Sequence, residues 1–208
     1  MQVKICGVRR VSDARACVAA GADLAGLNFV PSARRCVGDD VIDVRAALGS
    51  VTAVGVFADA SLDDIIARAT ALDLGWIQLH GQEPPALCAA LSGYQVIKAL
   101  GHDALVDPDR IRAYAPHVSR FLVDGRVPGS GRPWDVSTLA PRVHDGLLCG
   151  RPLFVAGGLN PENVSAVIEA VGPHGVDVAS GIEVDGRPDP ARIAAFCAAA
   201  RRPREEAA

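Results

Sequence analysis

The alternation of short apolar runs with helical stretches constrains the fold of this chain more than any other feature. Each run is followed by an amphipathic or Ala-rich stretch, and this unit repeats eight times. Strands are predicted near 3–6, 24–29, 52–57, 76–79, 95–98, 120–124, 152–156 and 175–178. Helices are predicted near 12–20, 40–48, 83–91, 108–114 and 190–200, and from about 61, 135 and 160.

Strands that alternate with helices indicate a parallel sheet, because parallel neighbours require crossover connections. The strands are continuously apolar, as expected when both faces of a sheet are buried. Eight units in 208 residues give 26 residues per unit, with no unit left over. We therefore predict a single closed (β/α)8 barrel over residues 1–200, with a flexible tail at 201–208. An open, doubly wound sheet is the alternative.

The composition is typical of a folded globular protein, with 50% hydrophobic and 22% charged residues. A net charge of −3 gives no general attraction to nucleic acid or to an anionic membrane. No apolar run approaches the roughly 20 residues of a membrane span, and the N-terminus lacks the apolar segment of a signal peptide. A cytoplasmic protein without membrane or nucleic-acid partners is predicted.

The cysteines and histidines show no metal-binding pattern. Six cysteines are present, with no C-x-x-C pair and no histidine at zinc-finger spacing. Most of these thiols are expected to be small buried apolar side chains. We predict no metal site and no nucleotide or flavin cofactor.

Polar residues stand where several predicted strands end, which in such a barrel is the functional face. They include Cys6, Asn28, His80, Lys98 and Asp124. Apolar runs seldom end on so many reactive groups. This pattern predicts an enzyme.

Glycine pairs follow the last two predicted strands. Gly157-Gly158 and Ser180-Gly181 expose backbone N–H groups that can donate to phosphate oxygens, although tight turns need glycine too. Because barrels bind phosphate after strands 7 and 8, we predict a phosphate site there. Gly129, Ser130 and Gly131 are expected to add further donors.

Six segments carry a resemblance to one family. They read VKICG at 3–7, VGVF at 54–57, IQLHG at 77–81, PGSG at 128–131, AGGLNPENV at 156–164 and GVDVASGIE at 175–183. With these motifs in this order, the chain resembles the N-(5′-phosphoribosyl)anthranilate isomerases of tryptophan biosynthesis. The resemblance covers nearly the whole chain.

The resemblance implies an Amadori rearrangement, in which a phosphoribosylamine opens and becomes a 1-amino-1-deoxyketose. It assigns Cys6 as the base that removes the C2 proton and Asp124 as the acid that protonates the ring oxygen. A thiol base needs a lowered pKa, which cationic or N–H-rich surroundings would supply. A raised pKa from partial burial would suit Asp124. Arg35 matches the arginine that pairs with the anthranilate carboxylate.

Four other roles stay open at this stage. His80 is expected either to contact substrate or to be a buried structural residue. Lys98 is expected inside the barrel mouth, in a structural ion pair or in catalysis. Asp177 is expected to bind a ribose hydroxyl or to fix a loop. Arg34 is expected to be a solvated charge or one that supports the residues in contact with substrate.

The chain departs from the family pattern at 31–37, at Asp59 and at 134–136. These differences affect the aromatic-amine end of the substrate more than the phosphate end. Two alternatives follow: an isomerase for another phosphoribosylamine of histidine or specialised metabolism, or an inactive phosphate-binding barrel. The histidine-pathway enzyme has aspartate at the place of Cys6, which favours the anthranilate substrate. The partner expected is a small phosphorylated molecule, bound by a monomer or homodimer.

Overall fold

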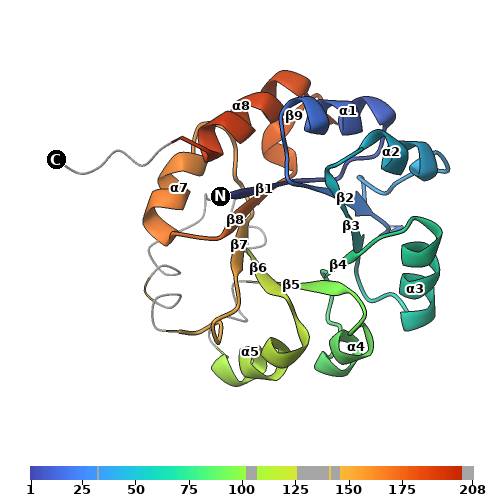
Figure 1. The fold of residues 1–208 in the computed structure, drawn as a ribbon. Helices are drawn as coiled ribbons and strands as arrows, with labels where there is room; N and C mark the ends of the chain where they lie inside the picture. Colours follow the sequence, from blue (N-terminus) through green and yellow to red (C-terminus); the bar gives the residue numbers. More distant parts are fainter. Residues whose placement is uncertain (32, 102–106, 126–140, 142–145, 203–208) are drawn as a thin grey trace.

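The computed structural model describes residues 1–31, 33–101, 107–125, 141 and 146–202. Eight parallel strands form a closed barrel in chain order, and β8 pairs with β1 (Figure 1). The strands are β1 (Gln2–Cys6), β2 (Leu24–Asn28), β3 (Thr52–Phe57), β4 (Trp76–Leu79), β5 (Gln95–Gly101), β6 (Arg120–Asp124), β7 (Leu153–Ala156) and β8 (Gly175–Val178). The closed ring confirms the predicted (β/α)8 fold and excludes the open sheet.

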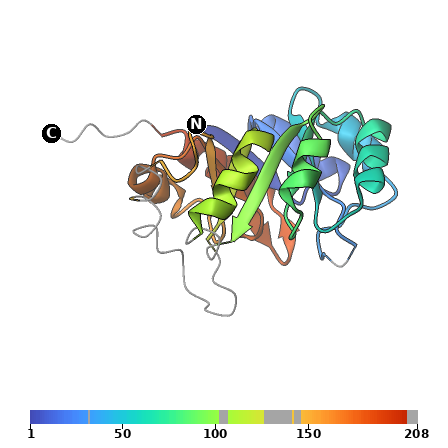
Figure 2. The ribbon, with the colours of Figure 1, turned by 90° about the horizontal axis from the view of Figure 1, so that it is seen from below.

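Helices surround the barrel on its outside, and Figure 2 shows them beside the strands in a view turned by 90°. They are α1 (Val11–Ala19), α2 (Val41–Ala47), α3 (Leu62–Ala71), α4 (Pro85–Ala90), α5 (Pro108–Tyr114), α7 (Val164–Val171) and α8 (Pro190–Ala200). Short 3-10 helices η2 (Ala115–His117) and η4 (Ser180–Ile182) and a two-stranded hairpin, β9 (Glu183–Val184) with β10 (Arg187–Pro188), complete the described elements. The helix predicted from 135 and most of the predicted tail lie outside the described residues.

Local sequence signals explain several helix ends. Ser61 caps α3, because its hydroxyl oxygen accepts a hydrogen bond from the backbone N–H of Asp64 at 3.1 Å. Asp107 and Asp189 cap α5 and α8 in the same way, and a proline follows each cap. None of the helices within the described ranges is long and apolar enough to cross a membrane.

The barrel interior is apolar in its middle and polar at both ends. The inner apolar cluster consists of Leu24, Val54, Trp76, Ile97, Ala99, Leu122, Phe154 and Ala156. At the N-terminal end, the guanidinium of Arg120 stacks on the rings of Trp76 and Phe154, 4.3 and 4.7 Å from their centroids. At the other end lie the buried polar side chains of Lys4, Gln78 and Asp177.

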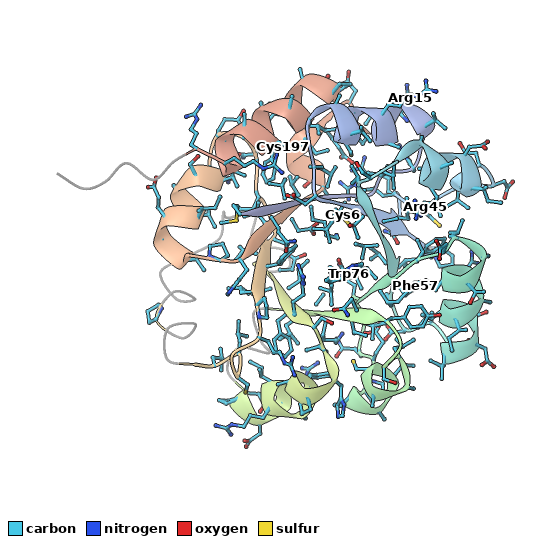
Figure 3. All side chains as sticks on the ribbon, viewed as in Figure 1. Cys6, Arg15, Arg45, Phe57, Trp76 and Cys197 are labelled. Carbon is cyan, nitrogen blue, oxygen red and sulfur yellow. The ribbon has the colours of Figure 1, made fainter. Side chains whose placement is uncertain are left out.

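The cysteines are more varied in burial than expected. Cys17, Cys88 and Cys197 are buried, Cys6 and Cys36 are half-buried, and Cys149 is exposed. Figure 3 shows Cys6 inside the ring of strands and Cys197 on α8 outside it. Only the three buried thiols fit the prediction of small apolar core residues.

Candidate active site

A cavity of about 310 Å3 opens at the C-terminal ends of the strands. The predicted site residues among those that line it are Cys6, Arg35, His80, Asp124, Gly157, Gly158, Asp177 and Ser180. They come from strand ends or loops spread around the ring, so barrel closure is what brings them together. Gly129, Ser130 and Gly131 lie outside the described residues.

Cys6 is the last residue of β1 and is half-buried in the cavity wall. Desolvation by burial raises the pKa of its thiol above the ordinary value, while the charges of Lys4 and Arg35 act to lower it. The expectation of a lowered pKa is therefore wrong for this state of the site, because burial outweighs the neighbouring cations.

Lys4 is the most important site residue that the sequence reasoning missed. Its side chain is fully buried, and its Nζ donates a hydrogen bond to Asp177 Oδ1 at 2.8 Å. The two residues are register partners on β1 and β8. Asp177 therefore neutralises a buried ammonium, a role that neither of the two expectations for it included. An inward-facing lysine two residues before Cys6 was the signal in the sequence.

Asp124 ends β6 and lies on the far side of β7 and β8 from Cys6. Its Oδ2 is 3.8 Å from His80 Nε2. The His80 side chain is 40% exposed, so the expectation of a buried structural histidine is wrong. Gln78, fully buried on β4, places its Nε2 2.9 Å from His80 Nδ1. Desolvation lowers the pKa of His80, although the charges of Asp124 and Asp177 act in the opposite direction.

Arg35 and Arg34 share one carboxylate. Arg35 donates from Nε and Nη2 to the two oxygens of Glu183 at 2.7 and 3.0 Å, and Arg34 donates to the same group at 2.5 Å. The Glu183 side chain is only 7% exposed. Desolvation acts to raise the pKa of Glu183, but these hydrogen bonds outweigh it and lower the pKa. Only Arg35 of the two lines the cavity. Arg34, 53% exposed, is anchored as well as solvated.

The segments after β7 and β8 meet at the cavity, where the phosphate site is predicted. Gly157 and Gly158 have φ of 91° and 69°, a conformation that favours glycine and turns successive N–H groups out of the strand. Ser180 begins η4, and both segments line the cavity. A Cβ on Gly181 would collide with the carbonyl oxygen of Leu159, so these two segments pack backbone against backbone.

Lys98 lies outside the barrel mouth, contrary to the expectation. Strand β5 continues to Gly101, and Lys98 alternates with Ile97 and Ala99, which face the interior. Its Nζ donates to Glu83 Oε2 at 2.7 Å and to the carbonyl oxygens of Leu79 and Gly81. Of the two roles left open for Lys98, the structural ion pair is the one observed.

Potential metal ligands do not converge within the described parts of the chain: no group of three or more His, Cys, Asp or Glu side chains could bind an ion. The polar groups of the cavity are instead one thiol, two carboxylates, an imidazole, a guanidinium, a carboxamide, a hydroxyl and backbone N–H groups. Such a set provides acid–base groups and donors for anions.

Comparison with known proteins gives a consistent result. The family model described as N-(5′phosphoribosyl)anthranilate (PRA) isomerase matches residues 3–199. The N-(5′-phosphoribosyl)anthranilate isomerase of Roseiflexus sp. (strain RS-1) is 43% identical over 97% of this chain and 98% of its own length. The crystal structure of the Thermotoga maritima phosphoribosyl anthranilate isomerase has a TM-score of 0.86 and 36% identity, covering 97% and 98% of the two chains.

A further solved structure contains a bound ligand. It is a phosphoribosyl anthranilate isomerase in complex with reduced 1-(o-carboxyphenylamino)-1-deoxyribulose 5-phosphate. This structure has a TM-score of 0.83 and 34% identity, with 97% of this chain and 98% of that chain covered.

Proposed function

The chain belongs to the N-(5′-phosphoribosyl)anthranilate isomerase family, and from that premise we propose how its own side chains carry out the isomerisation. The reaction converts N-(5′-phosphoribosyl)anthranilate into 1-(o-carboxyphenylamino)-1-deoxyribulose 5-phosphate in tryptophan biosynthesis. It moves hydrogen within one molecule and needs only an acid, a base and firm positioning.

The first step is ring opening, assisted by Asp124. Its carboxyl group donates a proton to the furanose ring oxygen as the C1–O bond breaks, and the nitrogen lone pair forms the C1=N bond. Cys6, as thiolate, then takes the C2 proton, and the released electron pair forms a C1=C2 bond while the C1=N π pair returns to nitrogen. The Cys6 thiol returns a proton to C1 and the Asp124 carboxylate accepts the C2 hydroxyl proton, which gives the ketone and restores both groups, so atoms and charge balance.

The observation that carries this assignment is that Cys6 and Asp124 line one cavity with the phosphate loops between them. Those loops follow β7 and β8, and these two strands separate β6 from β1 in the ring. A phosphate bound by the N–H groups of Gly157, Gly158, Ser180 and Gly181 places the ribose between acid and base. Gly129, Ser130 and Gly131 complete the same proposed site.

Arg35 is the proposed partner of the anthranilate carboxylate. Glu183 occupies the Nε/Nη2 edge of its guanidinium. Among the described residues no partner occupies the Nη1/Nη2 edge, which is the proposed site for bidentate binding of the substrate carboxylate. His80 is the proposed donor to a substrate oxygen, since its Nδ1 lies against the Gln78 amide and its Nε2 is directed toward Asp124.

Turnover of phosphoribosylanthranilate generated in situ tests the acid and the base. Cys6→Ser and Asp124→Asn are each expected to lower kcat by about 10²–10⁴-fold, the usual contribution of general acid–base catalysis. Near-normal turnover by Cys6→Ala would refute the assignment of the base. The histidine-pathway substrate, run in parallel, tests the alternative reaction. An inactive phosphate-binding barrel would turn over neither substrate.

We also propose a cytoplasmic enzyme, monomeric or homodimeric, that works without metal, cofactor, membrane or nucleic acid. The net charge of −3 and the acid–base character of the site support this. Activity that disappears on exhaustive chelation and returns with a divalent cation would contradict it. Light scattering of the purified chain distinguishes monomer from dimer.

A further inference from the structure

A buried ion pair lies at the cavity, whose wall includes Asp177. Lys4 has no exposed surface, and its Nζ is 2.8 Å from Asp177 Oδ1. Burial of a charged pair is costly, and apolar residues of similar volume often stabilise a fold better. The barrel interior below this level is filled with apolar side chains. A buried ammonium at this place therefore indicates a role beyond packing, set by the groups that it faces.

The Lys4 ammonium and the Cys6 thiol converge on one point. The two residues are separated by one position on β1, so their side chains project from the same face of the strand. A Cβ at Gly26 would lie 3.1 Å from Lys4 Nζ and 3.0 Å from Cys6 Sγ. Since both atoms are this close to one point, they are no more than about 6 Å apart.

Lys4 is also the strongest electrostatic influence in favour of a thiolate at Cys6. Burial raises the pKa of the thiol, Lys4 lowers it by charge and hydrogen bonding, Asp177 raises it, and Arg35 lowers it more weakly. His80 and Asp124 are the other titratable groups of the cavity wall. The carboxylate of Asp177 therefore moderates the cation without cancelling its effect on sulfur.

We propose that Lys4 is a positioning residue for the isomerisation: its buried ammonium, held by Asp177, stabilises the Cys6 thiolate that removes the C2 proton. The ammonium forms no bond with substrate and keeps its proton throughout. The thiol loses its proton to water at the open cavity before substrate binds. This inference rests on the proposed role of Cys6 as the base.

The experiment is a titration of the Cys6 thiol, followed by iodoacetamide alkylation and mass spectrometry of the Cys6 peptide from about pH 5 to 11. In Lys4→Met the pKa is expected to rise by about one or more, which lowers the thiolate fraction at pH 7 about tenfold. In Lys4→Arg the cation remains, so the pKa of the Cys6 thiol should rise much less than in Lys4→Met. In Asp177→Asn the pKa of the Cys6 thiol should fall, because no carboxylate then opposes the effect of the Lys4 charge on the sulfur.

Two double variants separate this effect from a loss of stability. Lys4→Met/Asp177→Asn removes the whole pair and should still raise the thiol pKa, though less than Lys4→Met alone. Lys98→Met/Glu83→Gln removes the other fully buried lysine pair, which lies outside the barrel. It should lower the melting temperature and leave the Cys6 titration unchanged.

Each outcome decides either the role of Lys4 or the role of Cys6. An unchanged Cys6 titration in folded Lys4→Met or in folded Lys4→Met/Asp177→Asn overturns the inference. A shift of the Cys6 pKa in Lys98→Met/Glu83→Gln equal to that in Lys4→Met overturns it as well. If the titration moves as expected but Cys6→Ser retains normal turnover, the proposed base is wrong while the coupling of Lys4 to the thiol stands. If Cys6→Ser is inactive and the titration does not move, only the role of Lys4 is wrong.

Discussion

Arg35 and Arg34 offer a matched pair of substitutions for testing how the substrate carboxylate is recognised. Both arginines donate to Glu183, so either alanine variant leaves one arginine on that carboxylate. The structural penalty should therefore be similar and small. Only Arg35 lines the cavity, with its side chain 22% exposed against 53% for Arg34. A difference in catalysis between the variants thus reports on substrate.

The size of the effect follows from the geometry of the guanidinium. A charge-assisted hydrogen-bonded pair contributes about 1.5–3 kcal/mol. At a factor of ten per 1.4 kcal/mol, Arg35→Ala should lower kcat/KM by about 10- to 150-fold. Arg34→Ala removes a half-exposed partner of Glu183 while Arg35 keeps both of its hydrogen bonds to that carboxylate, and it should change kcat/KM by less than about twofold.

Steady-state fluorescence with phosphoribosylanthranilate measures both variants, and a phosphoribosylaniline without the carboxylate provides the control substrate. With the control, the difference between the two variants should disappear, because neither arginine then has an anion to bind. Equal behaviour of the variants on the natural substrate, or an undiminished Arg35 penalty on the analogue, would refute the reasoning.

Three further predictions concern the scaffold of the site. Lys98 donates a hydrogen bond to Glu83, and this interaction outweighs desolvation and lowers the pKa of Glu83. The ionised carboxylate therefore stabilises the fold above about pH 4.3, and this contribution is lost as the pH falls through the folded pKa of Glu83. Glu83→Gln should cost about 3–5 kcal/mol at pH 7, and in urea unfolding its stability should approach that of wild type as the pH falls toward the folded pKa of Glu83. Gln78→Glu should raise the pKa of His80 and place a proton on Nδ1, which ¹⁵N NMR of the imidazole would detect. An unchanged tautomer would contradict this. Gly181→Ala should push η4 from Leu159 and raise KM for phosphorylated substrate more than it lowers kcat, whereas unaltered kinetics would exclude close packing there.

The fold could be predicted closely because its signals are local. The bounds of α5 and α8 agree with the predicted ranges, since proline after an aspartate cap marks where each helix begins. Strand ends were harder, and β5 runs to Gly101 instead of stopping at Lys98. That difference moved Lys98 from the barrel mouth to the outer face of the sheet.

The partners of the site residues could not be predicted, because they are distant in the chain. Lys4 and Asp177 are 173 positions apart, and Arg35 and Glu183 are 148 apart. Only closure of the ring between β8 and β1 gives the first pair its register. The direction of the Cys6 pKa was missed for a related reason: desolvation depends on how many side chains surround the thiol, which no single motif reveals.

The charges around Cys6 explain why a thiol suits this position better than a carboxylate would. In the resting site the thiol is neutral, so the buried ammonium of Lys4 is balanced by Asp177 alone. A carboxylate at the same place would set two negative charges beside one cation in a desolvated pocket, and like charges so close raise one pKa strongly. A thiol avoids this cost in the resting site, and when it ionises before substrate binds, Lys4 is already in place to stabilise the anion. The neutral resting state and the nearby cation thus serve the same step, the removal of one proton from C2.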